Sequence, residues 1–111
     1  MEELLKALRR FSKERDWAKF HNPKDLAVSI SIEAAELLEI FQWRSGEDQF
    51  DEQDIDHAAA EAADVLIYTL LLFDRLGLDP KVEVQRKMAQ NARRFPVSSW
   101  FGIPSAFKKR A

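Results

Sequence analysis

The glycines and prolines of this 111-residue chain are few, and they stand where helices would begin or end. Asn22-Pro23 and Asp79-Pro80 each place a capping side chain directly before a proline, which is favoured at the first position of a helix. Gly46 and Gly77 each follow a long segment with apolar residues at helical spacing, and glycine commonly ends a helix. This punctuation divides the chain into four helical segments, so we predict an all-α fold.

The spacing of apolar residues gives each predicted helix its approximate limits. These are residues 2–19, residues 23–43, a third helix from a cap at Asp51 or Asp54 to Leu76, and residues 80–94. Phe95-Pro96 ends the fourth helix, because the residue before a proline disfavours helical backbone angles. We therefore predict one domain with a four-helix core over residues 1–96 and a C-terminal tail over residues 97–111.

The third predicted helix is apolar on nearly every face between Ala58 and Phe73, apart from Glu61, Asp64 and two hydroxyl groups. A helix that is apolar all round must be buried all round, and a lone four-helix unit has few elements to cover it. We predict that a second subunit covers this helix, so that subunits assemble through helix packing. The alternative is that the tail folds over the exposed side.

Composition excludes several kinds of site. The chain has no cysteine, which excludes a disulfide framework, a zinc–thiolate site and a cysteine nucleophile. The net charge of −2 gives no general attraction to a nucleic acid polymer or an anionic membrane. The N-terminus begins Met-Glu-Glu-Leu-Leu-Lys and lacks the apolar region of a signal peptide. The longest near-apolar run, from Ala62 to Phe73, is too short for a membrane span, so we expect a soluble cytoplasmic protein.

Two acidic pairs, Glu33 with Glu36 and Glu61 with Asp64, interrupt the most apolar helices. Residues three apart share one face of a helix, so each pair presents two carboxylates together. Carboxylates are rarely buried without a cation or a metal, and neither pair has a lysine or arginine within one turn on its own helix. Mg²⁺ prefers carboxylate oxygens, so we predict that Mg²⁺ is the missing cation.

A short connection favours antiparallel packing of the second and third helices, which would bring all four carboxylates together. Like charges repel strongly in a partly dry site, so such a cluster requires a divalent metal or protons. The alternative is that both pairs are ordinary surface residues. A di-iron centre is a weaker alternative, since such bundles use Glu-x-x-His pairs, which are absent here.

Two further groups could contact a nucleotide. Lys87, Asn91 and Arg94 share one face of the fourth helix, where the two cations could neutralise phosphates; the alternative is a solvated polar face. An aromatic group near the ends of the second helix could stack on a base, although core packing is the commoner fate of such residues. This group is Trp17, Phe20 and Trp43, with His21 nearby.

Six motifs occur in order between about Phe11 and Pro96. They are Arg15-Asp16-Trp17, Phe20-His21-x-Pro23, Glu33-x-x-Glu36, Phe41-Gln42-Trp43, Glu61-x-x-Asp64-Val-Leu-Ile-Tyr68 and Lys87-Met-x-x-Asn91-x-x-Arg94-Phe95-Pro96. Together they resemble the MazG-like nucleoside triphosphate pyrophosphohydrolases, and most closely the dCTP pyrophosphatase branch of that all-α superfamily. Either acidic pair alone is a weak signal, but both pairs at this separation, flanked by these motifs, are specific.

The resemblance implies a Mg²⁺-dependent enzyme that hydrolyses a nucleoside triphosphate between the α- and β-phosphates, releasing a monophosphate and pyrophosphate. The substrate would be dCTP or a related or modified deoxynucleotide, and the role would be to clean the nucleotide pool. A non-catalytic helical interaction module with structural acidic pairs is the alternative function.

The resemblance also assigns residues. Glu33, Glu36, Glu61 and Asp64 would be the catalytic residues that hold Mg²⁺. The substrate would be bound by Trp17, His21 and Trp43 at the base, by Tyr68 and Asn91 at the sugar or phosphates, and by Lys87 and Arg94 at the phosphates. The dCTP-type relatives are tetramers built as dimers of dimers, with pockets where subunits meet, so we expect a dimer or a dimer of dimers.

The chain departs from the family pattern at a few positions. Phe95 replaces a frequent tyrosine, Ser31 and Ala35 replace frequent glycines, and Leu8 replaces a histidine of some dCTP-type members. The departures leave the acidic pairs intact and bear on the preferred base and sugar.

Overall fold

The computed structural model describes residues 1–46 and 49–104, and every regular element within them is helical. Five α-helices, four of them long, and one short 3₁₀ helix make up this part of the chain, which confirms the predicted all-α class. The chain forms two compact units, Met1–Leu78 and Asp79–Ala111. The domain predicted over residues 1–96 stays a prediction, and residues 105–111 of the predicted tail lie outside the described residues.

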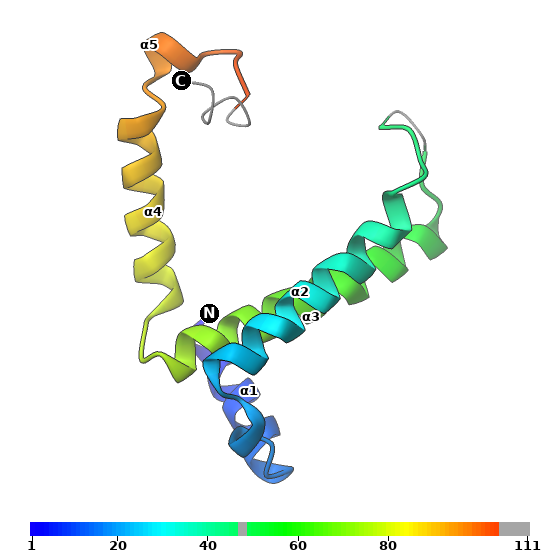
Figure 1. The fold of residues 1–111 in the computed structure, drawn as a ribbon, viewed down its shortest axis with the longest axis vertical. Coiled ribbons are helices and arrows are strands. Elements are labelled where there is room, and N and C mark those ends of the chain that lie inside the picture. Colours follow the sequence, from blue (N-terminus) through cyan, green and yellow to red (C-terminus); the bar gives the residue numbers. More distant parts are fainter. Residues whose placement is uncertain (47–48, 105–111) are drawn as a thin grey trace. The chain divides into compact units, whose positions relative to one another are not determined.

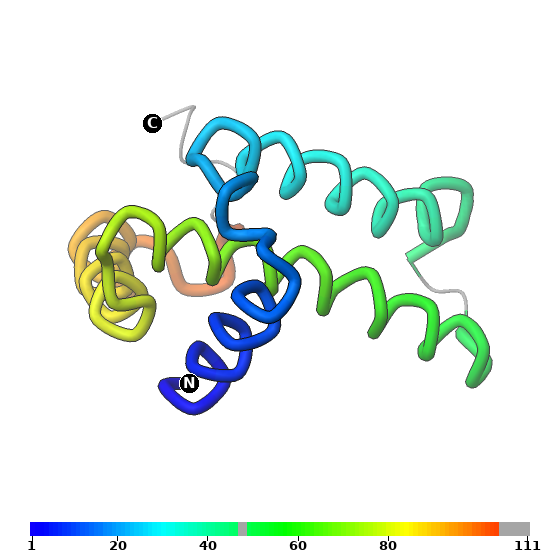
Figure 2. Tube along the Cα trace, turned by 90° about the horizontal axis from the view of Figure 1, so that it is seen from below, coloured from blue at the N-terminus to red at the C-terminus, as the bar shows by residue number. Residues whose placement is uncertain are grey.

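The first unit is built around a pair of long helices (Figures 1 and 2). It contains α1 (Glu2–Glu14), the 3₁₀ helix η1 (Ala18–Phe20), α2 (Pro23–Phe41) and α3 (Glu52–Arg75). The helices α2 and α3 lie side by side in both views and run in opposite directions, and α1 contacts α3. The antiparallel packing expected from the short connection is therefore present.

The predicted caps of α2 and α3 are confirmed. The side-chain oxygen of Asn22 accepts a hydrogen bond from the backbone N–H of Asp25 at 2.9 Å, and Pro23 opens α2. At the start of α3, Asp51 accepts from the backbone N–H of Asp54 at 2.8 Å, and the Asp54 carboxylate accepts in return from the Asp51 N–H. Such reciprocal bonds satisfy donors that the first turn of a helix leaves free. They fix where both central helices begin.

The predicted end of the first helix, near Lys19, is wrong, because α1 ends at Glu14. Asp16 adopts a φ of 53°, in the left-handed region that breaks a right-handed helix and that aspartate tolerates better than most residues. The backbone N–H of Trp17 then donates to the Ser12 carbonyl at 2.9 Å. This turn redirects the chain, and Trp17 stands at the start of η1.

Few apolar side chains are buried among the described residues of the first unit. The buried ones are Leu5 on α1, Leu26 on α2, and Leu70 and Leu71 on α3. In contrast, Ile32 on α2 is 52% exposed and Leu66 on α3 is 46% exposed. Apolar area of this extent on the central helices is typical of a surface that another chain or another part of the same chain covers.

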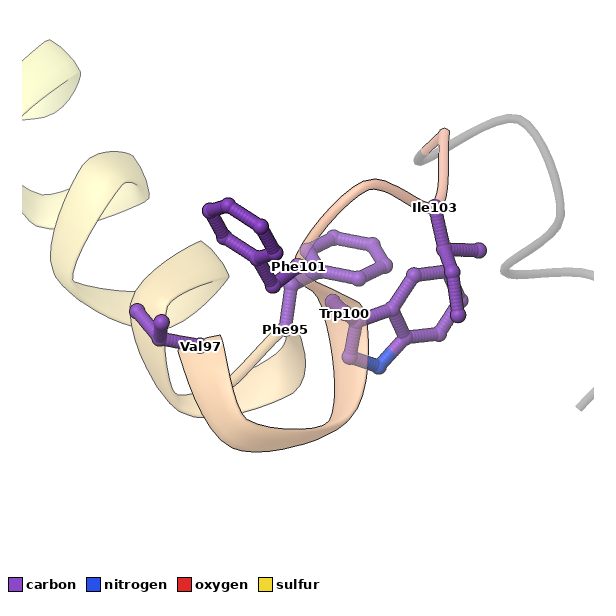
Figure 3. Close-up of a pocket in the computed structure, with 5 residues that line it drawn as sticks. All are labelled: Phe95, Val97, Trp100, Phe101 and Ile103. Carbon is purple, nitrogen blue, oxygen red and sulfur yellow. The ribbon is translucent and has the colours of Figure 1, made fainter.

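The second unit begins with α4 (Pro80–Arg94), which is capped by the Asp79 side chain as predicted. The sequence shows no period after Pro96, but residues Val97–Trp100 form a short helix, α5. An apolar pocket of about 280 Å³ follows. Its lining residues, drawn in Figure 3, are Phe95, Val97, Trp100, Phe101 and Ile103. The rings of Phe95 and Trp100 meet edge to face at 4.7 Å, which holds the end of α4 against α5.

Among the described residues, no helix combines the length and apolar character that a bilayer crossing requires.

Candidate functional site

The two acidic pairs face each other across the α2–α3 packing. Glu33 and Glu36 lie on α2, and Glu61 and Asp64 lie on α3. One carboxylate oxygen each from Glu33, Glu61 and Asp64 lies within 4.8 Å of the other two. Glu36 belongs to the same cluster, because its carboxyl group interacts with both Glu33 and Glu61. The structure thus brings all four predicted carboxylates together.

Two carboxylate oxygens in this cluster are buried without a partner. They are Glu33 Oε2 and Glu61 Oε2, and neither has a hydrogen-bond donor among residues 1–46 and 49–104. A buried oxygen that carries negative charge and lacks a donor costs free energy in a folded protein. His57 is a neighbour of the cluster, with its Nε2 atom 3.7 Å from Glu61 Oε1, but this oxygen is not the unpartnered one.

The crowding changes the acidity of the cluster. Burial, followed by the nearby Glu36 and Asp64 carboxyl groups, raises the pKa of Glu33 to about 7. Burial and Glu36 likewise raise the pKa of Glu61 above its ordinary value. Desolvation and like charges both disfavour the ionised form of a carboxyl group. The chain alone therefore holds this cluster with fewer negative charges than four free carboxylates would carry at neutral pH.

The cluster fits a hard divalent cation. Its ligand atoms are all carboxylate oxygens, the donor type that Mg²⁺ and Ca²⁺ prefer. The unpartnered oxygens of Glu33 and Glu61 would each gain a cation as a partner. A cation would also remove the repulsion that raises the two pKa values. The acidic cluster could therefore hold a metal ion.

An open pocket of about 310 Å³ lies between the N-terminal end of α2, η1 and α3. Its walls are aromatic and polar, and its lining residues are Trp17, Phe20, His21, Asp25, Leu26, Ser29 and Tyr68. Three predicted substrate-binding residues, Trp17, His21 and Tyr68, are thus brought together. Ser29 and Tyr68 each stand one helical turn from the acidic cluster on α2 and α3, so the pocket and the cluster share one side of the helix pair.

Sequence reasoning missed Asp25 as a lining residue, because its place in the first turn of α2 had a sufficient structural explanation. A signal was present. Asp25, Ser29 and Glu33 are spaced i, i+4, i+8, which places all three on one face of α2. Extending the acidic face by two turns toward the N-terminus would have found Asp25.

Trp43, the third predicted base-binding residue, lies elsewhere in the first unit. The 19 residues of α2 separate it from Trp17 and His21, which corresponds to about 28 Å of helix. Its side chain is 88% exposed. Next to it, Arg44 donates two hydrogen bonds of 2.8 Å to Asp54 and holds the pKa of that carboxyl below its ordinary value. Trp43 and Trp17 can therefore share a pocket only if the two come from different copies of the chain.

The predicted phosphate-binding residues belong to the second unit. Lys87, Asn91 and Arg94 lie on α4, where Lys87 Nζ donates to Gln90 Oε1 at 3.1 Å and Arg94 lies 5.5 Å from the Phe95 ring. Asn91 is partly buried. Their roles toward a substrate stay predictions.

The sequence model of the MazG-like family matches residues 28–109, which include most of α2 and all of α3, α4 and α5. The chain belongs to the MazG-like family. The acidic cluster of this MazG-like chain lies within the matched segment, whereas Trp17, His21 and Asp25 precede it.

This MazG-like chain is similar to a solved structure of a pyrophosphatase from Archaeoglobus fulgidus, with 54% sequence identity and a TM-score of 0.80. The likeness covers 86% of this chain and 92% of the other. The chain is also 35% identical to rat dCTP pyrophosphatase 1 and 34% identical to the human protein of that name, over 101 residues in each comparison. These matches cover 87% of this chain but only 59% of each dCTP pyrophosphatase 1.

Proposed function

We propose that this MazG-like chain is a nucleoside triphosphate pyrophosphohydrolase that uses Mg²⁺ and acts on dCTP or a related or modified deoxynucleotide. The observation that carries the proposal is the cluster of Glu33, Glu61 and Asp64, with two buried oxygens that lack a donor. The names of the relatives, a pyrophosphatase and dCTP pyrophosphatase 1, support the same reaction class and substrate. The products would be a nucleoside monophosphate and pyrophosphate.

Glu33, Glu36, Glu61 and Asp64 would hold the cation. A bound Mg²⁺ supplies positive charge to phosphate oxygens and makes a bound water more acidic. The protein's own contribution is a rigid platform, because the four carboxylates project from two helices that pack along their length. Elements of this kind position a site more accurately than loops do.

The pocket of Trp17, His21 and Tyr68 would receive the nucleoside. Asp25 and Glu33 are eight residues apart on α2, which corresponds to about 12 Å along the helix axis. This separation is comparable with the span from the α-phosphate to the far edge of the base in an extended nucleotide. A nucleotide with its phosphates at the acidic cluster would therefore place its base in the pocket, where aromatic rings can stack on it.

The remaining predicted contacts involve the second unit and a second copy. Lys87 would neutralise phosphate oxygens with its compact ammonium charge, and Arg94 would do so with its planar guanidinium group. Asn91 would form hydrogen bonds to the sugar or phosphates through its side-chain amide. Trp43 would complete a base pocket of another copy. We therefore propose a dimer or a dimer of dimers, supported by the exposed apolar side chains of α2 and α3. A cytoplasmic location stays a prediction.

The test is product analysis across a panel of nucleoside triphosphates. Purified protein with Mg²⁺ is expected to release pyrophosphate and the matching monophosphate from at least one deoxynucleoside triphosphate, and to release neither in EDTA. Release of single phosphates instead of pyrophosphate, or no turnover across canonical and modified substrates, would overturn the proposal. The alternative function, a non-catalytic helical interaction module, predicts no turnover of any substrate.

A further inference from the structure

Four polar side chains line the pocket between α2, η1 and α3, and one of them differs from the rest in what it can bind. They are His21, Asp25, Ser29 and Tyr68. The hydroxyls of Ser29 and Tyr68 can donate or accept a hydrogen bond, and a neutral histidine has one nitrogen of each kind. These three groups adapt to whatever a base presents. An ionised carboxylate only accepts, so Asp25 imposes a requirement on its partner.

The carboxylate of Asp25 is held in one orientation. Its Oδ2 atom accepts a hydrogen bond from Asn22 Nδ2 at 2.6 Å, while the backbone N–H of Asp25 donates to Asn22 Oδ1 at 2.9 Å. Within residues 1–46 and 49–104, no donor contacts the other oxygen, Oδ1. The helix cap thus accounts for one oxygen of Asp25 and leaves the second available at the pocket.

The position of Asp25 suits contact with a base and not with phosphate. It lies about 12 Å along α2 from Glu33, more than one Debye length at physiological salt. Its negative charge is therefore largely screened from phosphates bound at the acidic cluster. Lining residues nearer the cluster, Ser29 and Tyr68, lie where a sugar would pass.

We propose that Asp25 makes the pocket selective for a base with an exocyclic amino group, and that it favours cytosine over uracil and thymine. This inference rests on the proposed function. The amino group of cytosine donates a hydrogen bond, and aspartate is a suitable acceptor for it. Uracil and thymine present a carbonyl oxygen at the same place, so two acceptors would face each other without a proton between them. Asp25 is exposed in the free chain, so the penalty arises only when the bound base excludes water from this contact. A polar group that is then left without its partner makes a site reject an analogue.

The test compares dCTP with dUTP, which differ in this part of the ring and share the same sugar and phosphates. The specificity constant kcat/KM is measured for both substrates with the wild-type protein and with Asp25→Asn. The wild type is expected to favour dCTP, and Asp25→Asn is expected to lower the dCTP-to-dUTP ratio by about 10- to 100-fold, as for loss of a hydrogen bond to a charged group. The asparagine keeps an oxygen for Asn22, so the helix cap is retained.

Asp56→Asn is the matched control. Asp56 is an exposed aspartate on α3, twelve residues or about 18 Å of helix from Tyr68, and its change should leave the ratio as in the wild type. A second readout is the binding of the products dCMP and dUMP by calorimetry, where Asp25→Asn should weaken dCMP binding selectively.

Two results would overturn the inference while leaving the proposed function intact. The first is a wild type that prefers dUTP. The second is an unchanged dCTP-to-dUTP ratio in Asp25→Asn, and if kcat/KM falls equally for both substrates the role of Asp25 is structural. A wild type that hydrolyses no nucleoside triphosphate would instead overturn the proposed function, and the inference with it.

Discussion

At the scale of single residues, the acidic cluster could be identified from the spacing of its carboxylates and from their apolar surroundings. Glu33, Glu36, Glu61 and Asp64 were predictable because i, i+3 pairs share a helix face and because carboxylates are anomalous in apolar helices. Asp25 was missed although it shares a face of α2 with Ser29 and Glu33, because a residue in the first turn of a capped helix already has a structural role. The unpartnered oxygens of Glu33 and Glu61 depend on how α2 and α3 pack, which residue spacing does not determine.

The raised pKa values predict how the metal-free protein responds to pH. Glu33 has a pKa of about 7 in the folded chain against an ordinary value of 4.5. The folded state therefore binds this proton more tightly than the unfolded state, so the associated stability is complete below about pH 4.5 and is lost as the pH rises through 7. In EDTA, the melting temperature should fall between pH 5.5 and pH 8.

Glu33→Gln should flatten this dependence, since glutamine does not titrate, while Glu61 leaves part of it in place. Glu14→Gln, a change of an exposed glutamate on α1, serves as the control and should keep the wild-type slope. Thermal melts of the three proteins in EDTA across this pH range measure how steeply each melting temperature depends on pH. Equal slopes in wild type and Glu33→Gln would show that Glu33 does not carry the proton.

At the scale of elements, the helix starts were predictable and one helix end was not. Asn22-Pro23, Asp51 and Asp79-Pro80 act locally, through side chains that bond the first turn, so their effect is visible in sequence. The end of α1 depends on the left-handed backbone of Asp16, which follows apolar residues at unbroken helical spacing. The helical spacing of apolar residues continues past this turn, although the helix itself ends before it.

The hydrogen bond that caps α2 should contribute a measurable part of the free energy of unfolding. Asn22→Ala removes the oxygen that accepts from the Asp25 N–H, so the free energy of unfolding should fall by about 1 kcal/mol. Asn22→Ser keeps a capping oxygen and should recover most of that loss. Urea denaturation of the three proteins measures the difference. If the serine variant is as unstable as the alanine variant, the cap is not what stabilises this end of α2.

At the scale of the whole molecule, the first unit leaves an incomplete base site and exposed apolar helices. Trp43 lies at the far end of α2 from the pocket, and Leu66 on α3 is 46% exposed. Association of two or more copies of the chain could bring Trp43 of one copy to the pocket of another and could also cover the exposed apolar side chains. The sequence alone could predict that the apolar third helix must be covered by other residues. The distance between Trp43 and Trp17 became clear only from the length of α2 in the structure.

Complementation tests whether Trp43 acts in a neighbouring copy. Trp43→Ala and Asp64→Asn should each lower pyrophosphate release on their own. When both chains are expressed together, about a quarter of the sites would combine an intact acidic cluster with an intact Trp43 from the other chain, and activity should return in proportion. Sedimentation should show a species of two or four times the 12.9 kDa chain mass. No recovery in a mixed oligomer, or a monomer throughout, would contradict this arrangement.

The central claim is that the acidic cluster holds a divalent cation for hydrolysis of a nucleoside triphosphate. The most direct measurement is pyrophosphate release from dCTP as Mg²⁺ is titrated, for the wild type, Glu36→Gln, Asp64→Asn and the Glu14→Gln control. We expect Mg²⁺-dependent release by the wild type and the control, and a loss of roughly 100-fold or more in kcat/KM for both cluster variants. Turnover at the wild-type rate in Glu36→Gln or Asp64→Asn, or release that persists in EDTA, would contradict it.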